Sequence, residues 1–310
     1  MKKIIVMCAA LIMGVSTVIA GNKLSLKDIT SGKFAPKGLG SITALDDGDT
    51  YAQVSKDGKK IVRYSFRTGK QTDVLFDVDN TVGEKISSFE DYIMSPDGSK
   101  LLIQTKSRKI YRRSFTAVYY IYNIGSRKLE KLSDYGPQQS PVWSPDGKQV
   151  AFVRDNNIHL VKLLYGNAES QVTKDGKKNE LINGIPDWVN EEEFGFSTAL
   201  TFNADGTMIC WIKYDEAAVQ QYSLEMFKGS NPEKKEYAEY PGAYTYKYPK
   251  AGQVNSKVAV YSYDIQSHQT RKLQVPLDAD GYIPRLSATK DAQKMIVYTF
   301  NRHQNQLCPY

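Results

Sequence analysis

The sequence predicts an all-β fold, a β-propeller of four-stranded antiparallel blades, and three observations lead to it. One pattern recurs along the chain: an apolar or small residue, a turn centred on Asp-Gly, and then an alternating apolar strand. Its copies are VSKDGKKIVRY, MSPDGSKLLIQ, WSPDGKQVAFV and FNADGTMICWI, with a degenerate copy, ATKDAQKMIVY. The first copies begin about one blade length apart, allowing for insertions. Long helical periodicity, which would argue against an all-β fold, is missing from the sequence.

Each copy of the pattern has a local explanation. An Asp-Gly pair supplies the positive φ angles of tight hairpins, so the sequence predicts hairpin turns at 57–58, 97–98, 146–147 and 205–206. Short alternating strands are expected at Thr116–Ile124 and Asn157–Leu163, and 21 Tyr residues suit half-buried sheet faces. With roughly 45–55 residues per blade, residues 46–310 hold roughly five or six blades. The long step from Asp205 to Asp291 leaves room for one unmarked blade.

The N-terminus predicts export. Residues 1–20 have a basic start, an apolar run and small residues at the two positions that a signal peptidase reads, which is typical of a signal peptide cleaved after Ala20. The mature chain would begin with an N-terminal segment over residues 21–45 and would be periplasmic or secreted. No later stretch approaches the length of an apolar membrane span, so no span is expected after cleavage.

Composition and spacing exclude several classes of function. The formal net charge of +7 is spread along the chain without a Lys/Arg block among aromatics, so no nucleic-acid binding is expected. After cleavage only Cys210 and Cys308 remain, which gives no disulfide framework. The three His residues lie far apart, and no phosphate-binding glycine motif occurs. Neither a metal site nor a cofactor is therefore expected.

One acidic stretch calls for an explanation. Residues 187–196 read DWVNEEEFGF, with Glu191, Glu192 and Glu193 adjacent among aromatic residues. Helix chemistry offers one interpretation, in which Asn190 is the N-cap, Glu193 completes a capping box, and the other two acids lie in the first turn. A site for a bound cation offers another. These residues alone leave both interpretations open.

Several segments, in a fixed order, carry a family resemblance. They are LSLKDITSGKF, YRRSFTAVYYIYN, DNNIHLVK, NGIPDWVNEEEF, KYDEAAVQQYS and YPKAGQVN. With them, from about Leu24 to Phe300, the chain resembles the N-terminal propeller region of dipeptidyl peptidase IV, a serine exopeptidase of the prolyl oligopeptidase group. The DWVNEEEF part is the most specific of these segments, and YPKAGQVN is nearly as specific.

The resemblance implies both a fold and an activity. It implies an eight-bladed propeller that caps an α/β-hydrolase domain, the release of N-terminal dipeptides with Pro or Ala in second position, and a tendency to homodimerise. Peptide N-termini and the hydrolase domain are therefore the expected partners. It also implies that Glu192 and Glu193 hold the free α-ammonium group of the substrate, and that Arg112 contacts the carbonyl of its second residue and orients the acids.

The chemistry of an ammonium group agrees with these roles. Adjacent carboxylates offer several acceptors for its three donors, and charge-assisted hydrogen bonds are strong. A nearby Arg keeps both carboxylates ionised despite their mutual repulsion. Adjacent helical positions point about 100° apart, so Glu191 is expected to point elsewhere and to serve the cap or solvent.

No catalytic residue is assigned within the 310 residues. The Ser, Asp and His of the family belong to the hydrolase domain, and this sequence ends before that domain. We therefore interpret it as a truncated propeller that is inactive alone. Residues 195–199 nearly match the Gly-x-Ser-x-Gly elbow, but that elbow needs a strand before the Ser and a helix after it. A strand and a hairpin turn are expected after Ser197, so it is not expected to be a nucleophile.

Two other classes of function stay open at this stage. A non-catalytic exported scaffold propeller would also show Ser-Pro-Asp-Gly repeats, although it has no reason to keep both the acids and Arg112. A polysaccharide-active propeller would need paired carboxylates on different strands facing a sugar cleft, and the sequence identifies no such pair.

Overall fold

The computed structural model describes residues 24–36, 38, 40–229 and 235–310. The signal peptide expected at residues 1–20 lies outside them. The chain divides into two compact units, Met1–Ile42 and Thr43–Tyr310. The described part of the first unit contains one short helix, α2 (Leu26–Thr30), which begins with a capping box. Ser25 Oγ accepts from the Asp28 N–H at 3.1 Å, and the Asp28 carboxylate accepts from the Ser25 N–H at 3.1 Å.

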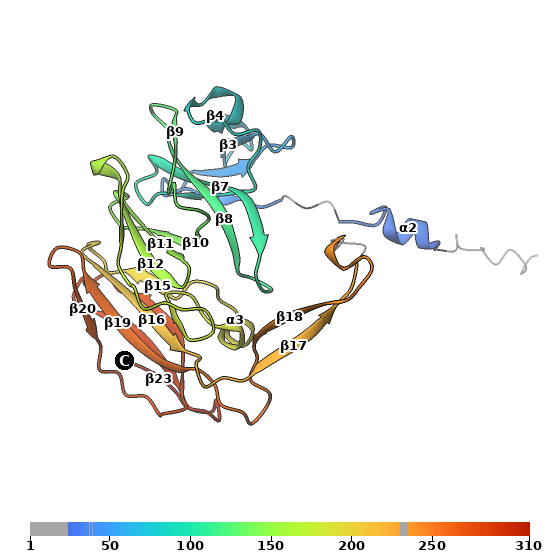
Figure 1. Ribbon diagram of the computed structural model, residues 1–310. Helices are drawn as coiled ribbons and strands as arrows, with labels where there is room; N and C mark the ends of the chain where they lie inside the picture. The colour runs from blue at the N-terminus through green and yellow to red at the C-terminus, as the bar shows by residue number, and fades with distance from the viewer. Residues whose placement is uncertain (1–23, 37, 39, 230–234) are drawn as a thin grey trace, which may run out of the picture. The chain divides into compact units, whose positions relative to one another are not determined.

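The second unit consists of short strands that form consecutive sheets along the chain (Figure 1). The first sheet contains β1 (Thr43–Ala44), β2 (Thr50–Val54), β3 (Lys60–Ser65) and β4 (Gln71–Asp77). The second contains β5 (Val82–Gly83), β6 (Asp91–Met94), β7 (Lys100–Lys109), β8 (Phe115–Asn123) and β9 (Lys128–Lys131). The third contains β10 (Gln139–Trp143), β11 (Gln149–Arg154), β12 (Asn157–Lys162) and β13 (Ala168–Gln171).

The later strands form two more sheets and a two-stranded ribbon. The fourth sheet contains β14 (Leu181–Asn183), β15 (Leu200–Phe202), β16 (Met208–Asp215), β19 (Lys257–Asp264) and β20 (Gln269–Lys272). The ribbon pairs β17 (Gln221–Met226) with β18 (Gly242–Lys247). The fifth sheet contains β21 (Tyr282–Ala288), β22 (Met295–Phe300) and β23 (Leu307–Pro309). Helical segments in this unit are α3 (Trp188–Phe194) and the 3₁₀ turns η1 (Val78–Asn80), η2 (Leu163–Tyr165) and η3 (Lys235–Tyr237).

The four predicted Asp-Gly turns are confirmed as hairpins, joining β2 to β3, β6 to β7, β10 to β11 and β15 to β16. Their glycines have φ angles of 64–72°, which side chains other than glycine rarely adopt. In the first three turns a Ser hydroxyl donates to the Asp carboxylate at 2.5–2.6 Å and accepts from the N–H five residues later at 2.9 Å. All these bonds lie within six residues, so each turn determines its own geometry.

The sheets depart from uniform four-stranded antiparallel blades in three places. β5 pairs with β9 in parallel, and the fifth sheet has three described strands. In the fourth sheet, both β14 and β15 pair with β16. The interval from Asp205 to Asp291, which left room for an unmarked blade, holds no separate four-stranded sheet among the residues that the structure describes. That interval contains the ribbon, followed by β19 and β20, which complete the fourth sheet.

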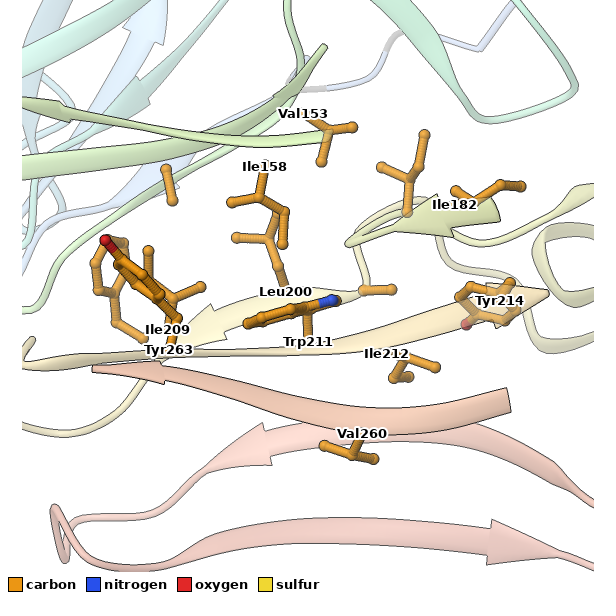
Figure 2. Packing of buried hydrophobic residues seen from close by; sticks show 14 of the residues in the cluster. Val153, Ile158, Ile182, Leu200, Ile209, Trp211, Ile212, Tyr214, Val260 and Tyr263 are labelled. Atoms are coloured by element: carbon orange, nitrogen blue, oxygen red, sulfur yellow. The ribbon is translucent and has the colours of Figure 1, made fainter. Parts of the chain in front are cut away.

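Apolar side chains alternate along the strands between two different cores. In β8, Tyr120 and Tyr122 belong to a core shared with the first sheet, whereas Tyr119 and Ile121 belong to a core shared with the third. Figure 2 shows the next core, in which side chains of β11 and β12 face those of β15 and β16, among them Trp211. Because successive strand residues point to opposite faces, a sheet covered on both sides needs nearly continuous apolar strands. Consecutive sheets therefore pack face to face.

Candidate functional site

Residues 187–196 form helix α3 and its two caps. Asp187 is the N-cap, because its Oδ1 accepts from the Asn190 N–H at 2.9 Å and from the Asn190 side-chain amide at 2.8 Å. The capping box expected from Asn190 and Glu193 is therefore wrong, since the helix already begins at Trp188. Gly195 ends the helix with a φ of 70°, and its N–H donates to the Glu191 carbonyl at 3.0 Å.

The three adjacent acids of α3 lie in three different environments, as their 100° separation requires. Glu191 is fully buried, and its Oε1 accepts from the N–H groups of Arg113 at 2.7 Å and Ser114 at 2.8 Å. Glu192 is half-buried and Glu193 is exposed. The expectation that Glu191 serves the cap or solvent is wrong, because its carboxylate reaches the loop between β7 and β8.

Arg112 lies in that same loop, beside Glu192. Its Nε is 2.7 Å from Glu192 Oε2, with 73% of the Arg112 side chain and 18% of the Glu192 side chain exposed. An ion pair this exposed contributes at most about 1 kcal/mol to stability, so it has little value for the fold. The remaining guanidinium N–H groups can donate to a ligand acceptor. The structure thus brings Arg112 and Glu192 together, and their role in binding substrate stays a prediction.

Glu193 borders a cleft of about 880 Å³ with aromatic walls. Trp188 stacks on Tyr248 with 4.1 Å between ring centroids, and Tyr246 contacts both rings. Lys250 lies over the ring of Tyr222 on the ribbon. Glu193 itself has no ion-pair partner among the residues that the structure describes. A carboxylate without a partner beside aromatic rings is suited to an organic cation.

Two further carboxyl groups are buried next to α3. Burial raises the pKa of Asp187, although hydrogen bonds from Ser256 and Asn190 oppose this effect. Glu216 follows β16, and its burial, together with the charge of Asp187, raises its pKa to about 7, against the opposing effect of Lys247. Glu216 therefore titrates near neutral pH, close to the N-cap of the helix that carries the acids.

The free energy of unfolding is expected to fall as the pH rises from about 4.5 towards about 7, where Glu216 ionises. A raised pKa means that the folded state favours the protonated form, so its stabilising contribution is complete below the unfolded pKa and is lost through the folded pKa. Glu216→Gln should flatten this dependence by about 2 kcal/mol, because the carboxyl keeps some contact with solvent. Urea unfolding at pH 5 and pH 8 measures it. The exposed-site control Glu84→Gln should keep the wild-type slope, and an unchanged slope in Glu216→Gln would contradict the assignment.

Ser197 lies in the wrong context for a nucleophile elbow. It follows helix α3 and precedes strand β15, which reverses the strand-then-helix order of that elbow. Its carbonyl accepts from Ser140 Oγ at 2.7 Å. In the described ranges no three His, Cys, Asp or Glu side chains gather closely enough to hold a metal ion. No helix of the described residues has the length and apolar composition to cross a membrane.

Two features of the site were missed by the analysis of the sequence. The Asp187 cap left a local signal, because Asp is a preferred N-cap and Gly195 stands where a C-terminal cap glycine belongs. The contact of Glu191 with Arg113 and Ser114 left no local signal. Arg113 and Ser114 precede Glu191 by 78 and 77 positions in the sequence.

Comparisons with known proteins agree with one another. A family model described as the dipeptidyl peptidase IV N-terminal region matches residues 95–308. The probable dipeptidyl-aminopeptidase B of Emericella nidulans is 32% identical over 93% of this chain and 33% of its own length. The human prolyl endopeptidase FAP is 30% identical over 78% of this chain and 30% of its own length. The chain thus spans about a third of the length of these curated relatives.

Two solved structures extend the comparison. The crystal structure of Porphyromonas gingivalis dipeptidyl peptidase 4 matches with 38% identity and a TM-score of 0.87, over 94% of this chain and 40% of that one. The crystal structure of a protein from Bacteroides ovatus, described as a putative dipeptidyl aminopeptidase IV, matches with 19% identity and a TM-score of 0.56, over 89% of this chain and 37% of that one. The first supports an all-β, propeller-like fold, and the second agrees on the fold alone.

Proposed function

Because this chain belongs to the family of dipeptidyl peptidase IV N-terminal regions, we propose that it is the substrate-recognising region of an exported serine exopeptidase. The enzyme releases N-terminal dipeptides, with Pro or Ala in second position. The consecutive sheets form part of a larger propeller, and their face-to-face packing supports this proposal. The catalytic Ser, Asp and His belong to an α/β-hydrolase domain outside these 310 residues.

The ion pair between Arg112 and Glu192, with Glu193 adjacent and unpaired among the described residues, carries the proposal. An exopeptidase has to recognise the end of its substrate, and the positive amine distinguishes that end. Glu192 and Glu193 accept the ammonium N–H groups. Arg112 pairs with Glu192 and donates to a carbonyl of the bound dipeptide. The site thus recognises the positive charge of the N-terminus and also a carbonyl group one or two residues away from it.

The test is the binding of a Gly-Pro dipeptide, with a free or an N-acetylated amine, to the purified chain by calorimetry. Binding should be at least about tenfold weaker after acetylation, because the recognised charge and its charge-assisted hydrogen bonds disappear. Equal affinities would exclude ammonium recognition, and binding of neither form would instead fit a non-catalytic scaffold.

The chain should not hydrolyse a Gly-Pro-linked chromogenic substrate. Turnover that is lost in Ser197→Ala would overturn the assignment of catalysis to another domain.

A further inference from the structure

The loop between β7 and β8 and helix α3 are joined by one buried side chain. Glu191 is 0% exposed, and its Oε1 accepts from two successive backbone N–H groups, those of Arg113 and Ser114. These residues directly follow Arg112, and Glu191 directly precedes Glu192. The Glu191 carboxylate therefore connects the backbone next to Arg112 with the backbone next to Glu192, the two partners of the ion pair.

The ion pair itself cannot hold Arg112 in place. The Arg112 side chain is 73% exposed, and an exposed pair of this kind gains little over solvent. Hydrogen bonds from backbone N–H groups to a buried carboxylate are stronger, because one partner is charged and water is excluded. The bonds to Glu191 therefore hold the backbone next to Arg112 more strongly than the guanidinium can, in addition to the Ile110 N–H bond to the Ser114 carbonyl within the loop.

The Arg113 side chain also lies beside the end of α3, because a Cβ atom placed on Gly195, the C-cap, would be 3.4 Å from Arg113 Nη2. Glu191 Oε2 and Ser114 Oγ are buried and have no hydrogen-bond partner within the part of the chain that the structure describes. The carboxylate is thus committed to the two N–H groups through a single oxygen.

We propose that Glu191 is a positioning residue of the proposed dipeptide site: its buried carboxylate clamps the Arg112 loop onto α3 and so sets the spacing of Arg112 from Glu192 and Glu193. The inference rests on the proposed function for its ligand, whereas the clamp is a property of the chain alone. Glu191 contacts neither the ammonium nor the carbonyl of the ligand and acts through Arg112.

Two variants of Glu191 separate the clamp from the volume of the side chain. Glu191→Met keeps the length of the side chain but removes the acceptor, so the N–H groups of Arg113 and Ser114 lose their partner. Glu191→Gln keeps an acceptor oxygen. The control is Glu90→Ala, which removes a carboxylate that accepts from the Ser107 N–H at 3.1 Å in strand β7, before the Arg112 loop begins.

Hydrogen exchange and calorimetry give the two readouts, each taken well below the unfolding temperature of every variant. In Glu191→Met the Arg113 and Ser114 amides should exchange at least about tenfold faster, and the free-amine Gly-Pro dipeptide should bind about 10- to 100-fold more weakly. Glu191→Gln should stay within about threefold of wild type in both, and Glu90→Ala should bind like wild type. In an Arg112→Ala background, Glu191→Met should cost no further affinity, since both changes act through Arg112.

Each result decides between the alternatives. If the amides exchange faster but the affinity is unchanged, Glu191 has a structural role only. The same follows if Glu191→Met weakens binding in the Arg112→Ala background by the same factor as in the wild-type background. Either result overturns the positioning role. Unchanged exchange in Glu191→Met overturns the clamp itself. If the wild-type chain binds no free-amine dipeptide, the proposed function fails and the positioning role fails with it. In that case the exchange data still report whether Glu191 holds the loop.

Discussion

Glu193→Ala is expected to raise the dissociation constant of the chain for a free-amine Gly-Pro dipeptide roughly 30-fold. The ammonium of the ligand would keep only Glu192, whose Oε2 already lies 2.7 Å from Arg112 Nε. A single carboxylate then serves two cations, and one ammonium N–H is left to water. In a protein that also carries the proposed hydrolase domain, the same change should lower kcat/KM by roughly 30-fold to several thousand-fold.

The matched control for this variant is Glu84→Ala, which removes the same charge from an exposed position beside β5. It should bind the dipeptide like wild type, because long-range electrostatics are screened at physiological salt. Wild-type affinity in Glu193→Ala would remove Glu193 from the site. A loss of equal size in both variants would mean that net charge matters, rather than the position of the carboxylate.

Trp211→Ala is expected to lower the free energy of unfolding by about 4–5 kcal/mol. Trp211 lies on β16 in the core shared by the third, fourth and fifth sheets (Figure 2) and is 1% exposed. Its removal leaves a large cavity, and it also leaves Asn183 Oδ1, which accepts from Trp211 Nε1 at 3.0 Å, without that donor in a buried place. Such a loss approaches the whole stability of many domains.

Urea unfolding followed by far-UV circular dichroism measures this effect without relying on Trp fluorescence. Tyr165→Ala is the control, because Tyr165 is 73% exposed on η2 and its truncation should change stability by no more than about 0.5 kcal/mol. A loss below about 2 kcal/mol in Trp211→Ala would mean that the neighbouring sheets collapse onto the vacated space.

The parts of the fold that follow from local chemistry could be predicted from the sequence. The Ser55–Asp57 turn closes by hydrogen bonds between residues no more than five apart, so six residues are enough to determine it. The strand over Thr116–Ile124 was expected from its alternation and is found as β8. The strands that make up the fourth sheet could not be predicted, because β16 pairs with β19 although the ribbon lies between them in the sequence.

The site divides in the same way. The resemblance carried by DWVNEEEF and YRRSF implied that acids and an Arg share one site, and the structure brings Arg112 and Glu192 together. Which of three adjacent acids is buried, paired or exposed was not readable from the sequence. A 7-residue helix turns each of them by about 100°, and the position of the neighbouring loop then decides their roles.

The sequence by itself determined the hairpins, the all-β class and the family. The hairpins and strands depend on interactions within a few residues, and the family depends on the residues of a few short segments. Only the tertiary structure decided that Glu191, rather than Glu192 or Glu193, is the acid that reaches the Arg112 loop. The physical reason is burial: a carboxylate removed from water must find donors, and its donors lie in a loop that only the packing of the second sheet brings within reach.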